Sequence, residues 1–430
     1  MTDATVFALA TPPGVSGVAV IRLSGPAANA ALSRLTDAVP PMPRIAALRT
    51  LRDRTGGALD RALVLRFPGP ASFTGEDVVE LHCHGSRAVI AAVLDILGDD
   101  PDLTPAEPGE FTRRAFANGR MDLTEVEALG DLLSAETEAQ RRFAMVNVSG
   151  ALRTRAEAWR EALLQARALV EATIDWVDEE VPEAVGPEVA ALIESVSVAL
   201  ADELAGAATH ERLRDGFEVA ILGAPNAGKS TLLNTIAGRE AAIATPVPGT
   251  TRDVLEVEVV LEGLPVRLLD TAGLRETEEM VERLGVAKAL ERAAAADLRL
   301  FLEAPDAPLP DDAHALWREG DLDVATKGDL RLSRAGSVSA LTGEGVGALL
   351  DTVALRLRSR VAGAGLVGHS RQRDCIARAL DHLRAAGLSA ESEIVAERLR
   401  LATRALESLT GRIDSEAVLG AVFSRFCLGK

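Results

Sequence analysis

Apolar and polar residues alternate differently in successive stretches of the chain. Over residues 1–118, short apolar runs rich in β-branched residues are each bounded by Gly, Pro or Ser. Runs of this kind predict strands at 18–23, 63–67 and 78–84. We therefore expect an N-terminal α+β domain over residues 1–118.

Two later stretches have a helical pattern. Residues 119–215 and 363–430 are rich in Ala, Leu, Glu and Arg. Apolar residues recur there at helical spacing, as at Trp159, Leu163, Leu164 and Ala168 and again at Leu399, Leu406 and Leu409. This spacing predicts long helices that form the two parts of one helical domain.

Residues 216–362, between the two helical stretches, return to alternating strands and helices. A strand is predicted at 217–222 and a helix at 230–237, an alternation typical of a parallel sheet with crossover helices. Domain termini tend to lie close together, which allows one domain to be inserted into another. We predict a multidomain α/β and α fold with an α/β domain inserted into the helical domain.

A phosphate-binding motif follows the predicted strand 217–222. Residues 223–230 read Gly-Ala-Pro-Asn-Ala-Gly-Lys-Ser, which matches G-x-x-x-x-G-K-[ST], the P-loop. Its glycines let backbone N–H groups surround the β-phosphate, and the helix N-terminus adds positive potential. Lys229 can neutralise β- and γ-phosphate oxygens, and Ser230 can ligate Mg²⁺. The motif predicts a nucleoside triphosphate site.

Three later motifs indicate that the nucleotide is GTP. Residues 270–273, Asp-Thr-Ala-Gly, supply a carboxylate for the metal's water shell and a glycine amide for the γ-phosphate. Residues 326–329, Thr-Lys-Gly-Asp, resemble the N-K-x-D guanine clamp, and residues 339–341, Ser-Ala-Leu, resemble the S-A-x loop that braces it. Asp329 can pair with guanine N1 and the exocyclic amine, which adenine cannot satisfy.

Leu274 stands where Ras-like GTPases have the glutamine that orients the attacking water. Leucine has no polar group for that task. Either hydrolysis is very slow, or another polar group orients the water and another positive charge stabilises the transition state. Glu282, in an acidic stretch of the second switch, is the candidate, and a solvated charged face is the alternative.

Composition limits the remaining functions. The chain has 64 acidic and 46 basic residues, only 3% aromatic residues and no tyrosine. Because nucleic-acid surfaces are basic and often stack bases on aromatic rings, we expect a partner to hold most of any bound RNA. No apolar run could span a bilayer and no signal-peptide pattern opens the chain, so we expect a cytoplasmic protein.

Several segments outside the nucleotide motifs are also distinctive. They are Pro-Pro-Gly at 12–14, Pro-Gly-Glu-Phe-Thr at 108–112 with Arg114, Ala115, Phe116, Asn118 and Gly119, and Phe-Cys-Leu-Gly-Lys at 426–430. Together with the nucleotide motifs, they resemble the tRNA modification GTPases of the MnmE (TrmE) type over essentially the whole chain.

The resemblance implies an assembly and a reaction. Folate-binding N-terminal domains would form a homodimer, and the inserted G domains would dimerise when potassium is present. A heterotetramer with the FAD-dependent MnmG (GidA) protein would add an aminomethyl or carboxymethylaminomethyl group to C5 of the wobble uridine of certain tRNAs. The carbon donor would be methylene-tetrahydrofolate.

The resemblance also implies roles for individual residues. Mg²⁺ ligands fall on Ser230 and Thr251, and the catalytic candidates are Glu282, Lys229 and Thr251. Potassium, which would supply the charge of an arginine finger, has its ligands at Asn226, Thr245, Val247 and Thr250. The GTP-binding positions are Asn226, Ala227, Gly228, Lys229, Ser230, Thr231, Thr245, Pro246, Val247, Pro248, Gly249, Thr250, Thr251, Asp270, Thr271, Ala272, Gly273, Thr326, Lys327, Asp329, Ser339, Ala340 and Leu341.

The folate site implied by the same resemblance falls on Arg22, Glu80, Arg120 and Lys430. Basic side chains suit the glutamate tail of a folate, and a carboxylate suits the N–H edge of the pterin. The ligand would be 5-formyl- or 5,10-methylene-tetrahydrofolate.

Two features depart from the family pattern. Thr326 replaces the usual Asn of the guanine clamp, so we expect a weaker hydrogen bond to the base and a weaker brace to the P-loop. The stretch from Glu303 to Val324 is short and Pro-rich, which predicts a trimmed G domain beside the base pocket.

Four other interpretations of the sequence compete with these. His82, Cys83 and His84 could suggest a metal site, but in a strand Cys83 would point away from both histidines. Cys427 could be a catalytic thiol or a semi-buried pocket cysteine. A ribosome-associated RNA-binding GTPase assembly factor would carry a basic RNA-binding module, and a membrane-remodelling GTPase would carry an amphipathic or lipidated segment. Folate binding by the isolated N-terminal domain would distinguish a tRNA modification GTPase from both the assembly factor and the membrane-remodelling GTPase.

Overall fold

The computed structural model describes residues 4–36, 38–175, 185–240, 256–270, 290–330, 337–361, 365–389, 391–413, 416–424, 426 and 429. The chain divides into two compact units, one formed by Met1–Gly130 with Glu407–Lys430 and the other by Asp131–Leu406. Each contains helices and a sheet, in agreement with the predicted mixture of α/β and helical parts.

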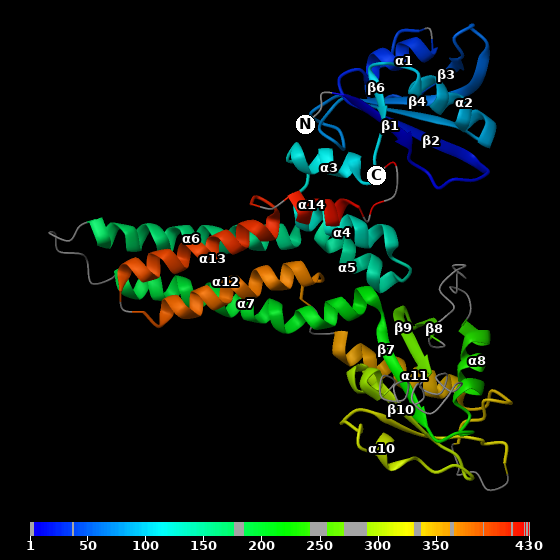
Figure 1. The fold of residues 1–430 in the computed structure, drawn as a ribbon, viewed down its shortest axis with the longest axis vertical. Helices are drawn as coiled ribbons and strands as arrows, with labels where there is room; N and C mark the ends of the chain where they lie inside the picture. The colour runs from blue at the N-terminus through cyan, green and yellow to red at the C-terminus, as the bar shows by residue number, and fades with distance from the viewer. Residues whose placement is uncertain are drawn as a thin grey trace, which may run out of the picture. The chain divides into compact units, whose positions relative to one another are not determined.

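The first unit contains a six-stranded sheet in the order β3-β4-β5-β2-β1-β6 (Figure 1). Its strands are β1 (Thr5–Leu9), β2 (Ser16–Ser24), β3 (Ala47–Arg52), β4 (Ala58–Phe67), β5 (Val78–Gly85) and β6 (Leu103–Pro105). Neighbouring strands are antiparallel except β1 and β6, which are parallel. The predicted strands at 18–23, 63–67 and 78–84 are confirmed as parts of β2, β4 and β5.

The two faces of this sheet differ in their covering. Helices α1 (Ala28–Thr36) and α2 (Arg87–Gly98) pack on one face, where Ile21, Leu23 and Cys83 belong to a single buried core. Because side chains alternate along a strand, Arg22 and the polar side chains of β5 fall on the opposite face.

Segments from the far end of the sequence complete the first unit. Beyond α3 (Glu110–Ala117) and the start of α4 (Leu123–Ser134), it contains the end of α13 (Ser392–Thr410) and α14 (Glu416–Phe423). Phe423 and Phe426 pack with Leu123 and Val126 in a buried cluster. At Gly109, whose φ is 73°, an added Cβ would lie 2.3 Å from the Phe423 carbonyl oxygen, so glycine is required for this close approach.

Long helices make up one part of the second unit. They are α5 (Glu138–Val148), α6 (Ala151–Asp175), α7 (Val185–Asp215), α12 (Ser370–Gly387) and most of α13. Trp159 and Leu163 are buried, as the spacing predicts, and so are Leu399 and Leu406. Ala168 is exposed, however, because the buried side of α6 continues instead through Ala166 and Val170.

The inserted α/β domain is the other part of the second unit. Its sheet has the order β11-β10-β7-β9-β8, and only the β8–β9 pair is antiparallel (Figure 1). The strands are β7 (Phe217–Gly223), β8 (Glu256–Leu261), β9 (Leu264–Asp270), β10 (Leu298–Glu303) and β11 (Leu322–Ala325), and the helices include α8 (Lys229–Glu240), α10 (Asp311–His314) and α11 (Val346–Val361). The predicted parallel sheet is confirmed. Between β10 and β11 lies the four-residue α10, and that this segment is trimmed relative to the family stays a prediction.

Among the described residues, no helix combines the length and the apolar character that crossing a membrane requires.

Candidate functional site

The P-loop lies between the end of β7 and the start of α8, as predicted. A Cβ added at Gly223 would lie 2.6 Å from the carbonyl oxygen of Leu302, so the loop passes too close to β10 for a larger residue. Asn226 has a φ of 64°, a left-handed conformation that asparagine adopts more readily than most residues. These constraints fix the loop around the N-terminus of α8.

Lys229 and Ser230 begin α8 with their functional groups at the loop. The Lys229 ammonium donates hydrogen bonds to the carbonyl oxygens of Gly223 and Ala224 at 2.7 and 2.8 Å, which holds a positive charge within the P-loop. The Ser230 hydroxyl donates to Asp270 Oδ2 at 2.9 Å, joining α8 to the end of β9. Hydroxyl and carboxylate oxygens are ligands that Mg²⁺ prefers, so this donor set fits Mg²⁺.

The segment predicted to bind the base is held by side-chain hydroxyl groups. Ser339 donates to Asp329 Oδ1 at 2.7 Å, which orients the carboxylate. Thr326 donates to the carbonyl oxygen of Ala227 in the P-loop at 2.8 Å. The threonine hydroxyl therefore keeps a direct brace to the P-loop backbone. That this brace is weaker than the one an asparagine would make stays a prediction. Ala340 also contributes, since its carbonyl oxygen accepts a hydrogen bond from Thr235 of α8 at 2.7 Å.

Several predicted site residues lie outside the described part of the chain. They are Thr245, Pro246, Val247, Pro248, Gly249, Thr250, Thr251, Thr271, Ala272, Gly273, Leu274, Glu282, Cys427 and Lys430. Their roles in binding potassium, magnesium, the γ-phosphate, the attacking water and folate stay predictions.

Arg22 and Glu80, two of the four predicted folate residues, lie together on the face of the first unit's sheet opposite α1 and α2. Arg22 Nη2 and Glu80 Oε1 are 2.9 Å apart, and β2 and β5 place the two residues directly opposite each other. Arg22 Nη1 also donates to the carbonyl oxygen of Gly429 at 3.5 Å. The structure thus brings the C-terminal segment to this pair.

Aromatic rings flank Arg22, and sequence reasoning missed them. The Arg22 guanidinium lies 5.6 Å from the centre of the Phe73 ring and 5.7 Å from that of Phe111. Phe73 is 38% exposed, so its ring is available to a ligand. Arg120, the third folate candidate, is exposed beside the same loop, where a Cβ added at Gly75 would lie 3.3 Å from its Cγ. An aromatic residue in a turn of a chain so poor in aromatics is the signal that could have identified Phe73.

Comparison with known families accounts for nearly the whole chain. The MnmE helical domain matches residues 123–427, and the N-terminus of the GTP-binding protein TrmE matches residues 5–120. The chain belongs to the MnmE family of tRNA modification GTPases. It is 50% identical over 434 residues to the tRNA modification GTPase MnmE of Roseobacter denitrificans, covering 99% of this chain and 100% of that protein. The MnmE of Cereibacter sphaeroides (strain ATCC 17029) is 52% identical over 431 residues, with the same coverage.

Partial similarity to solved structures covers about a third of the chain. Era from Aquifex aeolicus is 25% identical, covers 32% of this chain and 56% of its own, and has a TM-score of 0.26. The G domain of the iron transporter FeoB from T. maritima is 21% identical, covers 33% of this chain and 98% of its own, and has a TM-score of 0.24.

In this MnmE-family chain, the histidines of β5 do not form a metal site. Cys83 is buried in the core on the helical face, as the alternation predicts, and burial raises the pKa of its thiol to about 12. His82 Nε2 contacts Glu80 at 3.1 Å, and His84 Nδ1 contacts Asp60 at 2.6 Å. Among the described residues, no group of three or more His, Cys, Asp and Glu side chains could hold a metal ion.

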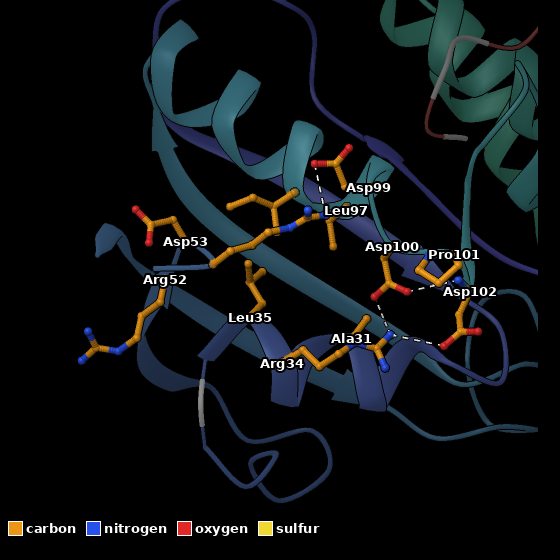
Figure 2. A pocket seen from close by; sticks show the side chains of 12 residues that line it. Ala31, Arg34, Leu35, Arg52, Asp53, Leu97, Asp99, Asp100, Pro101 and Asp102 are labelled. Carbon is orange, nitrogen blue, oxygen red and sulfur yellow. Dashed lines mark hydrogen bonds and ion pairs between the residues drawn. The ribbon is translucent and has the colours of Figure 1, made fainter. Parts of the chain in front are cut away.

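A cavity of about 360 Å³ lies on the helical face of the first unit's sheet (Figure 2). Arg22 belongs to the opposite face of that sheet. The charged side chains of the cavity largely neutralise each other, because Arg34 pairs with Asp100 and with Asp102, and Arg54 pairs with Asp99 at 3.1 Å. Figure 2 shows Arg34 reaching both aspartates across the cavity. None of the residues that the family resemblance assigns to folate lines this cavity.

A polar cluster joins the two chain segments that enter and leave the inserted domain. We name Asp131, His210, Arg214 and His369 the junction cluster. Arg214, in the last turn of α7, donates to His369 Nδ1 at 2.8 Å and to the carbonyl oxygen of Gly368, and His369 Nε2 lies 2.9 Å from Asp131 Oδ2. Sequence reasoning missed this cluster because its members carry no motif.

Proposed function

We propose that this chain is a potassium-activated GTPase that, together with the FAD-dependent MnmG (GidA) partner, modifies C5 of the wobble uridine in certain tRNAs. One observation carries the GTPase part. Lys229, the Ser230–Asp270 pair and the Thr326–Ala227 brace join the ends of β7, β9 and β11 into one site. The match to MnmE relatives over 99% of the chain supports the tRNA part.

Each described residue has a task in this proposal. Lys229 neutralises phosphate oxygens, and the N-terminus of α8 directs its backbone N–H groups at the phosphates. Ser230 would hold Mg²⁺ directly, with Asp270 fixing the metal's water shell, and Mg²⁺ would neutralise charge that develops on the β- and γ-phosphates. Asp329, oriented by Ser339, would accept hydrogen bonds from guanine N1 and the exocyclic amine.

Potassium is proposed because the chain lacks the usual water-orienting glutamine. With Leu274 in its place, a cation bound by Asn226 and the 245–250 loop would supply positive charge, and Glu282 would orient the water. We expect hydrolysis in potassium to be much faster than in sodium at equal ionic strength. Equal rates in the two salts would refute the proposed activation.

A substitution tests the role of Glu282. Glu282→Ala should lower turnover by about 10²-fold with little change in nucleotide affinity, as expected for a group that acts mainly in the transition state. Glu278→Ala, a neighbouring acidic position, serves as the control and should leave turnover unchanged. Equal turnover of Glu282→Ala and the wild type would show that Glu282 is only a solvated charge.

Folate binding is proposed around Arg22 and Glu80, on the face of the sheet opposite α1 and α2. Glu80 would accept hydrogen bonds from the pterin, while Arg22, Arg120 and Lys430 would face acidic or carbonyl groups of 5-formyl- or 5,10-methylene-tetrahydrofolate. Equilibrium dialysis of 5-formyl-tetrahydrofolate against the full chain tests this. Binding should be lost in Glu80→Gln and kept in Asp53→Asn, whose side chain lines the cavity on the helical face of the sheet. Equal binding by both variants would place folate at another site.

The assembly is proposed to be a homodimer that joins MnmG in a cytoplasmic heterotetramer. With 64 acidic and 46 basic residues, the chain alone should bind tRNA weakly and with a shallow salt dependence. Adding MnmG should produce the tight tRNA complex. A tight, steeply salt-dependent tRNA complex of this chain alone would contradict the proposal.

A further inference from the structure

The Thr326 hydroxyl donates its only proton to the protein backbone. The residue is 5% exposed, and its hydroxyl lies 2.8 Å from the carbonyl oxygen of Ala227 and 3.2 Å from that of Glu303. Both partners are acceptors, and a hydroxyl has one proton to donate. The backbone N–H of Thr326 also donates to the Glu303 carbonyl oxygen, at 2.8 Å.

An asparagine at this position would have more to offer. Its amide carries two N–H donors, so one could brace the P-loop while the other faced the base. Threonine satisfies the brace and has no donor left. Residue 326 therefore contributes a backbone contact to the site and no hydrogen-bond donor to a bound nucleobase.

Guanine presents different groups on its two edges. The N1 and N2 donors belong to the edge that a carboxylate recognises, and N7, on the opposite side of the ring system, is an acceptor that needs a donor. Asp329, held by Ser339, suits the first edge, and Thr326 lies on the P-loop side of the site through its bond to Ala227. With the N1 and N2 edge placed against Asp329, N7 points away from that carboxylate, and the Thr326 hydroxyl has no proton left to offer it.

We infer that this site recognises guanine through its N1 and N2 edge without a hydrogen bond from residue 326 to N7, and that it accepts guanine nucleotides altered at N7. The substrate class includes 7-deazaguanine nucleotides, in which N7 is replaced by C–H. This inference rests on the proposed GTP binding and deepens it.

The test compares the affinities of GDP and 7-deaza-GDP for the full chain in the presence of Mg²⁺, by isothermal titration calorimetry. For the wild type, the two dissociation constants should agree within about twofold. In Thr326→Asn, the restored donor should favour GDP over 7-deaza-GDP by about threefold to tenfold. A wild-type preference for GDP in that higher range would overturn the inference, whatever Thr326→Asn does.

Thr326→Val separates the brace from base recognition. It removes the hydroxyl, so GDP and 7-deaza-GDP should both bind more weakly while the ratio of their dissociation constants stays that of the wild type. A ratio that changes in Thr326→Val would show that the hydroxyl serves the base and would also overturn the inference. If the wild type binds neither nucleotide, GTP binding itself is wrong, which is a different result from a preference for GDP.

Discussion

His210 is the more deeply buried of the two histidines in the junction cluster. It is 4% exposed, its Nδ1 finds no hydrogen-bond partner among the described residues, and its ring lies 5.2 Å from that of Phe143. Burial lowers the pKa of His210, and nearby His369 and Arg214 lower it further, while Asp131 opposes them. The folded protein therefore favours neutral His210.

The sign of the resulting pH dependence follows. An unfolded histidine takes up a proton near its ordinary pKa of about 6.5, whereas folded His210 does so only at lower pH. The unfolded state binds more protons in that interval, so the contribution of His210 to stability is lost as the pH falls below about 6.5. His210→Gln should flatten the fall in urea midpoint between pH 7.5 and 5.5. His314→Gln, at an exposed position, should not, and equal effects of the two variants would contradict this account.

The Cys83 thiol should not react with alkylating reagents in the folded protein. Because burial raises the pKa of its thiol to about 12, almost no thiolate exists at pH 8, and the side chain is 1% exposed. Iodoacetamide at pH 8 should leave Cys83 unlabelled in native protein and label it fully in urea, as read by mass spectrometry. Labelling of Cys83 in the native state at the rate seen in urea would refute its burial.

At the scale of elements, Arg299 ties the helical segment 290–295 to the central sheet. Its guanidinium donates to the carbonyl oxygens of Ala293, Ala294 and Ala296, and pairs with Asp321 at 2.7 Å. The pair is 2% and 0% exposed. The end of the helix, which would otherwise leave carbonyl groups unpaired, is thereby closed by a side chain of β10.

Removing one partner of this pair should be costly. Arg299→Leu should lower the free energy of unfolding by about 3–5 kcal/mol, because it leaves the Asp321 carboxylate buried without its partner. Arg299→Leu combined with Asp321→Leu should recover much of that loss, since no charge stays buried. Chemical denaturation measures both variants. A double variant less stable than Arg299→Leu would show that backbone capping, and not the charge, determines the effect.

The elements that could be predicted from sequence are those specified locally. The strand 18–23 shows in its own apolar run, and the P-loop is complete within eight consecutive residues. Ala168 shows where helical spacing fails to predict burial, because the side of α6 that packs against its neighbours is slightly different from the one the spacing indicates. The Arg22–Gly429 contact and the junction cluster could not be predicted, since each joins residues far apart in sequence that carry no motif.

At the scale of the whole molecule, the junction cluster joins the chain segment that enters the inserted domain to the segment that leaves it. Arg214 precedes β7, and the segment 365–369 follows α11, so one guanidinium connects both crossings of the chain. The same segment is held by Glu203, whose Oε2 accepts from the Leu366 N–H at 2.8 Å, and by Asn147, which donates to the Leu366 carbonyl oxygen at 2.8 Å.

Loss of Arg214 should therefore loosen the returning segment. Hydrogen bonds to charged groups are worth about 1.5–3 kcal/mol, so Arg214→Ala should speed hydrogen exchange across 365–369 by about 10- to 100-fold. Mass spectrometry of exchanged peptides measures this. Arg212→Ala, which removes the ion pair with Asp297 in the same unit, is the control and should leave that segment protected. Unchanged exchange in Arg214→Ala would mean that Glu203 and Asn147 suffice.

The contact between Arg22 and Gly429 also sets an order of events in biosynthesis. The two residues are separated by 407 positions, and a Cβ at Gly429 would lie 2.2 Å from the Leu9 carbonyl oxygen, so the tail fits against β1 only as glycine. At about 5–20 residues per second, a ribosome needs roughly 20–80 s to pass from Arg22 to Gly429. Throughout that interval the contact between the sheet and Gly429 is missing, which leaves the corner of the sheet at Arg22 open. A chain whose synthesis stops before Gly429 never closes this corner. A ligand that requires the closed corner would therefore bind only chains whose synthesis has passed Gly429.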